Sequence, residues 1–421
     1  MNAAGLLSNA LDGAVVIECG SEQGEFAGVL LASLGAEVVK LEGRHGSDSR
    51  RLGPFSIPDG GPEHSLCFSR YNLGKKSVRL EIDHPAARDA LRRLAMRADV
   101  IIDSGTADAV ARRLDFYREM QLANPRLIVC TITPFGLDGP SRDLAMTNLT
   151  HLALGGVMAS CGYDARPDGV YDTAPIAPEM WQAYHIAGEY AVIAITAALN
   201  FRELTGEGDC IDLSIHEAVS SCTEVAMPTY IYNGEVVKRQ TGRHAAEGRT
   251  RPWLRRTKDG RYVKAFLFWG GRDVRVITEM LNEAGVAHDL DSDEYRELRE
   301  RAPAEAQAHF SAMIDKLVGS MTAEEVFHRA QAKGLLWASV RYPEENIADP
   351  HFQARGTFQP IHHPELGRDL HYPVSVATDG KDRVTGFSRG APRLGEHTDE
   401  VLAQAGLTVS DIAVLRTQGA L

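Results

Sequence analysis

The first 150 residues alternate short apolar runs with amphipathic stretches. Apolar runs of strand type lie at residues 14–18, 37–41, 100–103 and 126–133. Helical periodicity is found at 26–34 and again at 86–98, where Pro85 stands near the first turn, a position that proline favours. Strands that alternate with helices predict an α/β fold with a parallel, doubly wound sheet.

The second half of the chain has a different pattern. A largely apolar helix is predicted over 188–199, and residues 208–221 alternate like a strand before they become helical. Few long apolar runs occur at 223–250, which predicts a linker or crossing segment. A second unit is predicted to begin near Pro252 with a strand at 261–269.

Helical segments continue to residue 334. In the stretch 321–334, Thr322 and Glu325 have the spacing of a capping box. Beyond residue 335 turn signals dominate, and a last helix is predicted at about 398–405.

The net charge of the chain argues against some classes of binding partner. The 421 residues include 45 basic and 57 acidic side chains, a net charge of −12, which argues against a nucleic-acid or anionic-membrane surface. The longest apolar run, 190–199, is shorter than the roughly 20 residues that a membrane helix needs. No signal-peptide pattern opens the chain and the six cysteines form no C-x-x-C pair, so we expect a cytoplasmic protein with reduced thiols.

Local motifs do not reveal a catalytic site. Gly20, Gly24 and Gly28 have the spacing G-x3-G-x3-G, which differs from the G-x-G-x-x-G of a dinucleotide site. Neither a P-loop nor a G-x-S-x-G elbow occurs. His185 and Glu189 form an isolated i, i+4 pair, which is more typical of packing than of a metal site, so no metal is expected.

Seven stretches in order resemble the class III CoA-transferases, the family that includes formyl-CoA transferase, carnitine CoA-transferase and the α-methylacyl-CoA racemases. The matching stretches are residues 30–51, 72–102, 123–140, 195–219, 349–358, 362–367 and 391–402. They span nearly the whole chain. The resemblance implies an α/β fold in which a large doubly wound domain and a smaller α+β domain form an intertwined dimer. It implies a large domain made of residues 1–222 and the returning tail 335–421, with a linker and small domain at 223–334.

The resemblance also implies a carboxylate nucleophile at the start of a helix. In the family, an aspartate attacks an acyl-CoA thioester and carries CoA between two carboxylic acids. Counting back without gaps from Ala191 matches this aspartate to Tyr184, and allowing an insertion matches it to Pro178. Neither residue is an acid. Glu179 is the outside candidate for a displaced nucleophile, although a first-turn glutamate that favours the helix dipole explains it better.

The racemase branch of the family needs a histidine and an aspartate that exchange a proton. The residues that match them here are Thr147 and Tyr184, which cannot shuttle a proton at neutral pH. Racemisation is therefore not expected.

The CoA-contacting turns of the family are also altered. Residues 103–106 lack the aromatic and the arginine of the family's turn after the third strand, and residues 20–25 add two carboxylates where an anionic ligand would lie. The positions that still match a degenerate CoA cleft are Ser21, Arg44, Lys75, Leu80 and Ser104.

These departures predict a catalytically silent subunit that pairs with an active, homologous subunit carrying the aspartate. The chain resembles heteromeric family members such as succinyl-CoA:(R)-benzylsuccinate CoA-transferase, and this resemblance implies succinyl-CoA as donor and an aromatic or dicarboxylic acceptor. CoA or acyl-CoA is then a substrate that the partner subunit holds, and no covalently bound cofactor is expected. Two alternatives stay open: a homodimeric CoA-transferase that uses Glu179, and a non-enzymatic acyl-CoA-binding protein.

Overall fold

The computed structural model describes residues 10–223, 225–266, 271–292, 295, 304–363, 367–373, 386–387 and 389–421. Residues 267–269 of the strand predicted at 261–269 lie outside this set. The chain divides into two compact units. Unit 1 comprises Met1–Met158, Ala177–Glu224 and Pro350–Leu421, and unit 2 comprises Ala159–Ile176 and Val225–Asp349. Each unit is described by itself.

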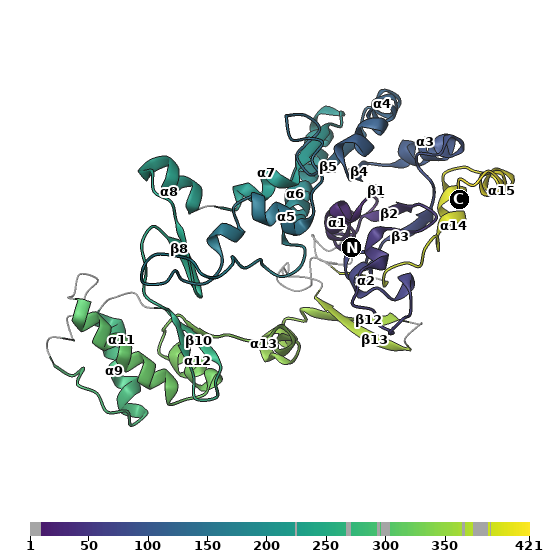
Figure 1. Cartoon of the computed structure of the whole chain (residues 1–421). Helices are drawn as coiled ribbons and strands as arrows, with labels where there is room; N and C mark the ends of the chain where they lie inside the picture. Colours follow the sequence, from purple (N-terminus) through teal and green to yellow (C-terminus); the bar gives the residue numbers. More distant parts are fainter. Residues whose placement is uncertain are drawn as a thin grey trace. The chain divides into compact units, whose positions relative to one another are not determined.

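Unit 1 is built on a six-stranded parallel sheet, shown in Figure 1, whose order is β3-β2-β1-β4-β5-β6. The strands are β1 (Val15–Gly20), β2 (Glu37–Glu42), β3 (Lys76–Arg79), β4 (Val100–Ser104), β5 (Ile128–Thr133) and β6 (Cys210–Ser214). The predicted doubly wound α/β fold is confirmed. Because the chain builds outward from β1 in one direction and then returns to β4 in the other, the switch point lies between the carboxyl ends of these two strands.

Helices cover both faces of this sheet. One face packs against α3 (Arg88–Arg97), α4 (Ala107–Ala123), α14 (Thr398–Gln404) and α15 (Val409–Thr417). The other face packs against α1 (Glu25–Ser33), α5 (Asn148–Leu154), α6 (Gln182–Thr205) and α7 (Ile215–Ser221). The C-terminal helices thus return to the N-terminal sheet, as Figure 1 shows in yellow beside β3.

Smaller elements complete unit 1. They are α2 (Leu66–Tyr71), α13 (Pro350–Ala354) and the antiparallel hairpin of β12 (Phe358–His363) and β13 (Arg368–Pro373). Short 3-10 helices occur along the chain at η1 (Glu22–Gly24), η2 (Asp48–Arg51), η3 (Pro62–His64), η4 (Pro85–Ala87), η5 (Met158–Ser160) and η6 (Pro343–Ala348). Among the helices of the described residues, none combines the length and apolarity that a membrane crossing requires.

Unit 2 has its own core between a small antiparallel sheet and three helices. The sheet has the order β11-β10-β9, and the helices are α9 (Gly271–Glu283), α11 (Ala304–Gly319) and α12 (Ala323–Ala332). The strands are β9 (Leu254–Arg256), β10 (Tyr262–Ala265) and β11 (Trp337–Ser339). The indole of Trp337 is fully buried and donates to the Phe266 carbonyl at 2.9 Å. The predicted capping box of Thr322 and Glu325 is confirmed at the start of α12.

The stretch 223–250 is not a plain linker, which corrects the prediction. It contains α8 (Ala226–Asn233) and the hairpin of β7 (Lys238–Gln240) and β8 (Arg243–Ala246). Arg243 of β8 forms a bidentate ion pair with Asp164, which ties residues 159–176 into unit 2. These strands are short and polar, so their stability comes from such pairs and not from an apolar pattern that the sequence displays.

A buried cluster of charges lies under the carboxyl end of β1. Glu18 of β1 and Lys40 of β2 are neighbours in register, and their carboxylate and ammonium are 2.7 Å apart. Lys40 also contacts Glu25 at 3.0 Å, and Lys75 contacts the second oxygen of Glu18 at 2.6 Å. All four side chains are at most 1% exposed. Buried charges of this kind are retained only when each one is paired.

Stability of unit 1 should fall in mild acid because of one carboxylate, Glu42. Burial alone would raise the pKa of Glu42, but Arg50, with Lys40 and Ser77, lowers it from 4.5 to about 2. The stabilisation from the ionised Glu42 carboxylate is therefore fully present above the ordinary pKa of 4.5 and is lost as the pH falls through the pKa of the folded protein. The free energy of unfolding should fall by about 2 kcal/mol between about pH 6 and about pH 3. Urea unfolding at the two pH values measures it. Glu42→Gln should flatten the pH dependence, and equal slopes for the two proteins would contradict the assignment.

Candidate functional site

The switch point of the sheet is closed by two tightly joined turns. A Cβ atom added at Gly20 would lie 1.8 Å from the Ser104 carbonyl oxygen, so only glycine fits there. The Ser21 amide donates to that carbonyl at 3.0 Å, and the Ser104 hydroxyl donates to the Ser21 carbonyl at 2.9 Å. The Ser21 backbone and the Ser104 hydroxyl, two positions predicted to line a CoA cleft, thus join the turns after β1 and β4, while the Ser21 hydroxyl accepts from the Gln23 amide.

The start of helix α6 is tied to the first residue of α5, Asn148. The Asn148 amide donates to the Met180 carbonyl at 2.8 Å, and its oxygen accepts from the Ala183 amide at 2.9 Å. Met180 has a positive φ of 55°, so the chain turns sharply just before the helix. Thr147, which matches the racemase histidine, caps α5 by accepting from the Thr150 amide. Its role in the structure is that of a helix cap.

Tyr184 is a core residue of unit 1. Its side chain is 3% exposed and belongs to the apolar cluster between α6 and the sheet. Burial and the nearby charge of Glu22 raise the pKa of the Tyr184 phenol above its usual range, while hydrogen bonding to the Asn148 backbone and the Gln23 side chain lowers it by less. The phenol is therefore neutral at physiological pH. At the start of α6, where the resemblance implies a carboxylate, the structure has a buried and uncharged phenol.

The neighbouring 3-10 helix carries groups that repel an anion. Burial, followed by the charges of Glu25 and Asp48, raises the pKa of Glu22. Within the described part of the chain, Gln23 Oε1 and Glu25 Oε2 are buried without a hydrogen-bond partner. A negatively charged group placed here would meet carboxylates and bare acceptors, so the turn is poorly suited to a CoA phosphate.

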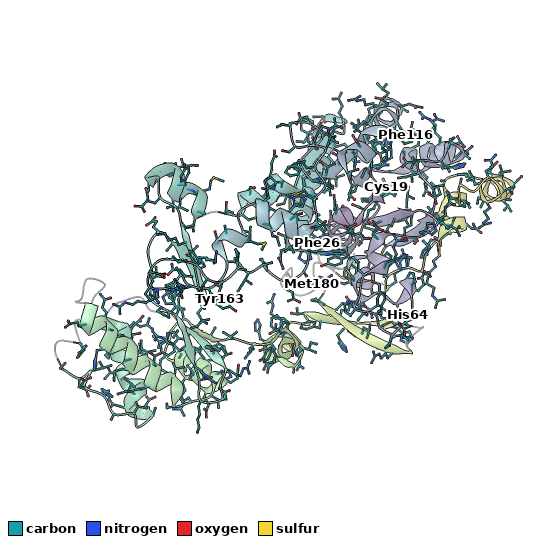
Figure 2. The ribbon with its side chains drawn as sticks, viewed as in Figure 1. Cys19, Phe26, His64, Phe116, Tyr163 and Met180 are labelled. Atoms are coloured by element: carbon teal, nitrogen blue, oxygen red, sulfur yellow. The ribbon has the colours of Figure 1, made fainter. Side chains whose placement is uncertain are left out.

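A cavity of about 350 Å³ opens beside the same helix start. Its wall is formed by Pro54, Leu66, Cys67, Arg70, Tyr71, Glu179, Met180, Gln182 and His185. Figure 2 marks Met180 and, close to it, Phe26, whose ring lies 4.2 Å from that of His185. Tyr71 hydrogen-bonds His185 Nε2 at 2.8 Å and stacks on Trp181 at 4.7 Å. Contacts with the Phe26 and Tyr71 rings thus hold this side of the α6 start in place.

Glu179 lies at this cavity and is exposed. The structure brings it near His185, Gln182 and Arg70, but not near Tyr184 in the core. Burial, and then the positive charge of Arg70, lower the pKa of His185 to about 4, so the imidazole is neutral near pH 7. Neutral histidine beside a carboxylate can accept a proton, but no second acid lies in the cavity wall among the described residues.

The other predicted CoA contacts do not form one site. The Lys75 ammonium is fully buried and donates to Glu18, to the Glu25 carbonyl and to Asn72, at 2.6, 2.9 and 3.0 Å. A lysine has three donors, and in this structure all three are engaged within the protein. Leu80 is 1% exposed in the core.

Arg44 remains accessible on the surface. Its side chain is 60% exposed and pairs with Glu81 at 3.0 Å. Arg44 lies just beyond the end of β2. Its hydrogen bonds are to Glu81, and neither Ser21 nor Ser104 is among its partners. Arg70, in contrast, was missed by the sequence analysis, since an arginine in a short helix carries no local signal of a cavity. No group of three or more metal-ligating side chains is found among the described residues.

Comparison with known proteins shows which protein family this chain is similar to. The model of the family described as CoA-transferase family III matches residues 11–398. Subunit BbsE of succinyl-CoA:(R)-benzylsuccinate CoA-transferase from Thauera aromatica is 28% identical, over 96% of both chains. The beta subunit of succinyl-CoA–L-malate CoA-transferase from Chloroflexus aurantiacus is 28% identical, over 93% of both chains. A crystal structure of a CAIB/BAIF family protein from Brucella suis superimposes with a TM-score of 0.77 at 24% identity, over 94% of this chain and 99% of that chain.

Proposed function

The chain belongs to CoA-transferase family III, and from this premise we propose that it is the non-catalytic subunit of a heteromeric enzyme that moves CoA between carboxylic acids. The observation that carries the proposal is the buried, neutral phenol of Tyr184 at the position matched to the family's aspartate. Two relatives that resemble the chain over more than nine-tenths of its length are named as subunits of larger enzymes, which supports a partner.

The chemistry explains why this position matters. A carboxylate oxygen attacks the thioester carbonyl, the CoA thiolate leaves, and a mixed anhydride forms; the thiolate then attacks the enzyme's own acyl carbon, releases the first acid and leaves CoA bound to the enzyme as a thioester. The acceptor acid repeats the sequence in reverse. Each step needs an acyl carbon on the enzyme, which tyrosine lacks.

The proposed partner is a homologous subunit that carries the aspartate. In an intertwined dimer the present chain contributes the sheet and helix starts that enclose the partner's site, and the partner holds the CoA. We propose succinyl-CoA as the donor, because the relatives are named for it. We propose a dicarboxylic or aromatic acceptor such as benzylsuccinate, because one relative is named for it and the Tyr71 ring in the cavity wall can contact an aromatic group.

The chain alone should acquire no covalent CoA. Incubation of the purified protein with succinyl-CoA, followed by intact-mass analysis, is expected to return the unmodified mass, because no carboxylate stands at the matched position. Glu179→Gln is expected to give the same result.

Two other outcomes would contradict this proposal. A CoA adduct on the peptide 177–195 that disappears in Glu179→Gln would establish a homodimeric transferase using Glu179. Tight acyl-CoA binding without turnover, in a protein that associates with no homologous subunit, would favour a non-enzymatic acyl-CoA-binding protein.

A further inference from the structure

Arg70 is an unusual cation. It lies in the last turn of α2 and lines the 350 Å³ cavity beside the α6 start. Within the described part of the chain its guanidinium forms no hydrogen bond or ion pair, and its nearest aromatic contact is the Tyr71 ring at 6.0 Å. Burial lowers the pKa of Arg70. A partly desolvated arginine normally has an anionic partner, so this one lacks a counter-charge.

The helix geometry aims this cation into the cavity. Ser65 caps α2, and Leu66 and Arg70 are four residues apart, as are Cys67 and Tyr71, so all four lie on one side of a single turn. All four line the cavity. The local sequence therefore presents a positive charge among apolar and aromatic neighbours.

The remaining wall carries little charge. Burial, and then the charges of Glu25 and Glu22, raise the pKa of the Cys67 thiol to about 12, so it stays protonated. His185 is neutral near pH 7 and is engaged by Tyr71. Among the described wall residues, Arg70 is thus the single cation and Glu179 the single anion. The Glu179 carboxylate forms no ion pair with Arg70 in the structure.

We propose that Arg70 binds a carboxylate of a short organic acid in this cavity, which makes the cavity an acid-recognition subsite of the transferase; this rests on the proposed function. The guanidinium can hold a carboxylate by two parallel hydrogen bonds, and the apolar wall of Leu66 and Pro54 receives the carbon chain. A phosphate is disfavoured, because it has no carbon chain to place against the apolar wall of Leu66 and Pro54. The volume is at the low end for small-molecule sites, which suits a four-carbon dicarboxylate.

The test is calorimetric titration of the full chain with succinate. The wild type should bind, and Arg70→Met should bind about tenfold more weakly or not at all, since a charge-assisted hydrogen-bond pair is lost. Arg118→Met is the matched control, because it removes the same charge from an exposed site and should leave the affinity unchanged. Arg70 has no hydrogen-bond or ion-pair partner among the residues that the structure describes, so circular dichroism and the melting temperature of Arg70→Met should match the wild type.

Parallel titrations identify the source of the carboxylate. Succinate and succinyl-CoA both offer a free carboxylate, whereas butyryl-CoA offers the same chain without it. Arg70-dependent binding of the first two but not the third supports the subsite, and binding of succinyl-CoA alone assigns the carboxylate to the acyl donor. Equal affinities of wild type and Arg70→Met, absence of binding to all three, or tighter binding of inorganic phosphate would each overturn the proposal.

These titrations do not measure turnover, so their failure is distinct from failure of the proposed function. A covalent CoA adduct on the lone chain would overturn the non-catalytic assignment while leaving Arg70-dependent binding intact. Loss of Arg70-dependent binding would remove the subsite while leaving the silent-subunit assignment untouched.

Discussion

Replacing Lys40 with methionine is expected to lower the free energy of unfolding of unit 1 by about 3–5 kcal/mol, the scale measured when one partner of a buried ion pair is removed. Lys40 faces Glu18 at 2.7 Å and Glu25 at 3.0 Å, with no solvent to replace it. Burial alone would lower the pKa of Lys40, but Glu18 and Glu25 raise it above its usual range. Without the ammonium, Glu18 keeps Lys75, whereas Glu25 keeps only the Ser49 hydroxyl.

Equilibrium urea unfolding followed by circular dichroism measures this loss. Arg88→Met is the matched control, because it breaks an ion pair with Glu119 that is about half exposed, and such pairs are worth about 0–1 kcal/mol. Adding Glu25→Gln to Lys40→Met should recover part of the stability, since it removes the stranded carboxylate. A Lys40→Met protein as stable as Arg88→Met would show that the buried cluster is not a determinant of the fold.

The fold was predictable where burial on both faces leaves continuous apolar runs. The apolar runs at 100–103 and 126–133 correctly predict β4 and β5. Central parallel strands are covered by helices on each side, so nearly all of their side chains are apolar. The edge strand β3 was missed, since Lys76–Arg79 is short and begins and ends with a charge. Its pairing with β2 is long-range and leaves no local pattern.

The candidate site was predictable only in part, for the same reason. The helix predicted over 188–199 from its periodicity lies within α6, which begins earlier, at Gln182. The surroundings of Lys75 follow from no local pattern, because its main partner, Glu18, is 57 residues away in sequence. Two adjacent lysines resemble a surface pair, and one of them proves to be fully buried. Arg70 is the converse case, a charged residue in a short, mostly apolar helix whose cavity is formed by residues of α2 together with residues at the start of α6.

Transferase activity of the complete enzyme is expected to depend on the partner and not on Tyr184. Coexpression of this chain with an active paralogue should give succinyl-CoA-dependent CoA transfer to a dicarboxylic acid. Replacing the partner's nucleophilic aspartate with alanine should reduce kcat by roughly 10³-fold or more, because removal of a covalent nucleophile abolishes the acyl-enzyme route. Chromatographic assay of the product thioester, on complexes purified by size exclusion, measures both.

Tyr184→Phe is the matched variant in this chain. It removes the hydroxyl but keeps the ring that fills the core, so kcat should change by less than about threefold and the free energy of unfolding by about 1 kcal/mol or less. Glu179→Gln should likewise leave kcat within a few-fold. Activity that survives loss of the partner's aspartate but falls with Glu179→Gln would place the nucleophile in this chain. The same helix start would then act through its exposed glutamate, and the buried tyrosine would serve only to pack the helix against the sheet.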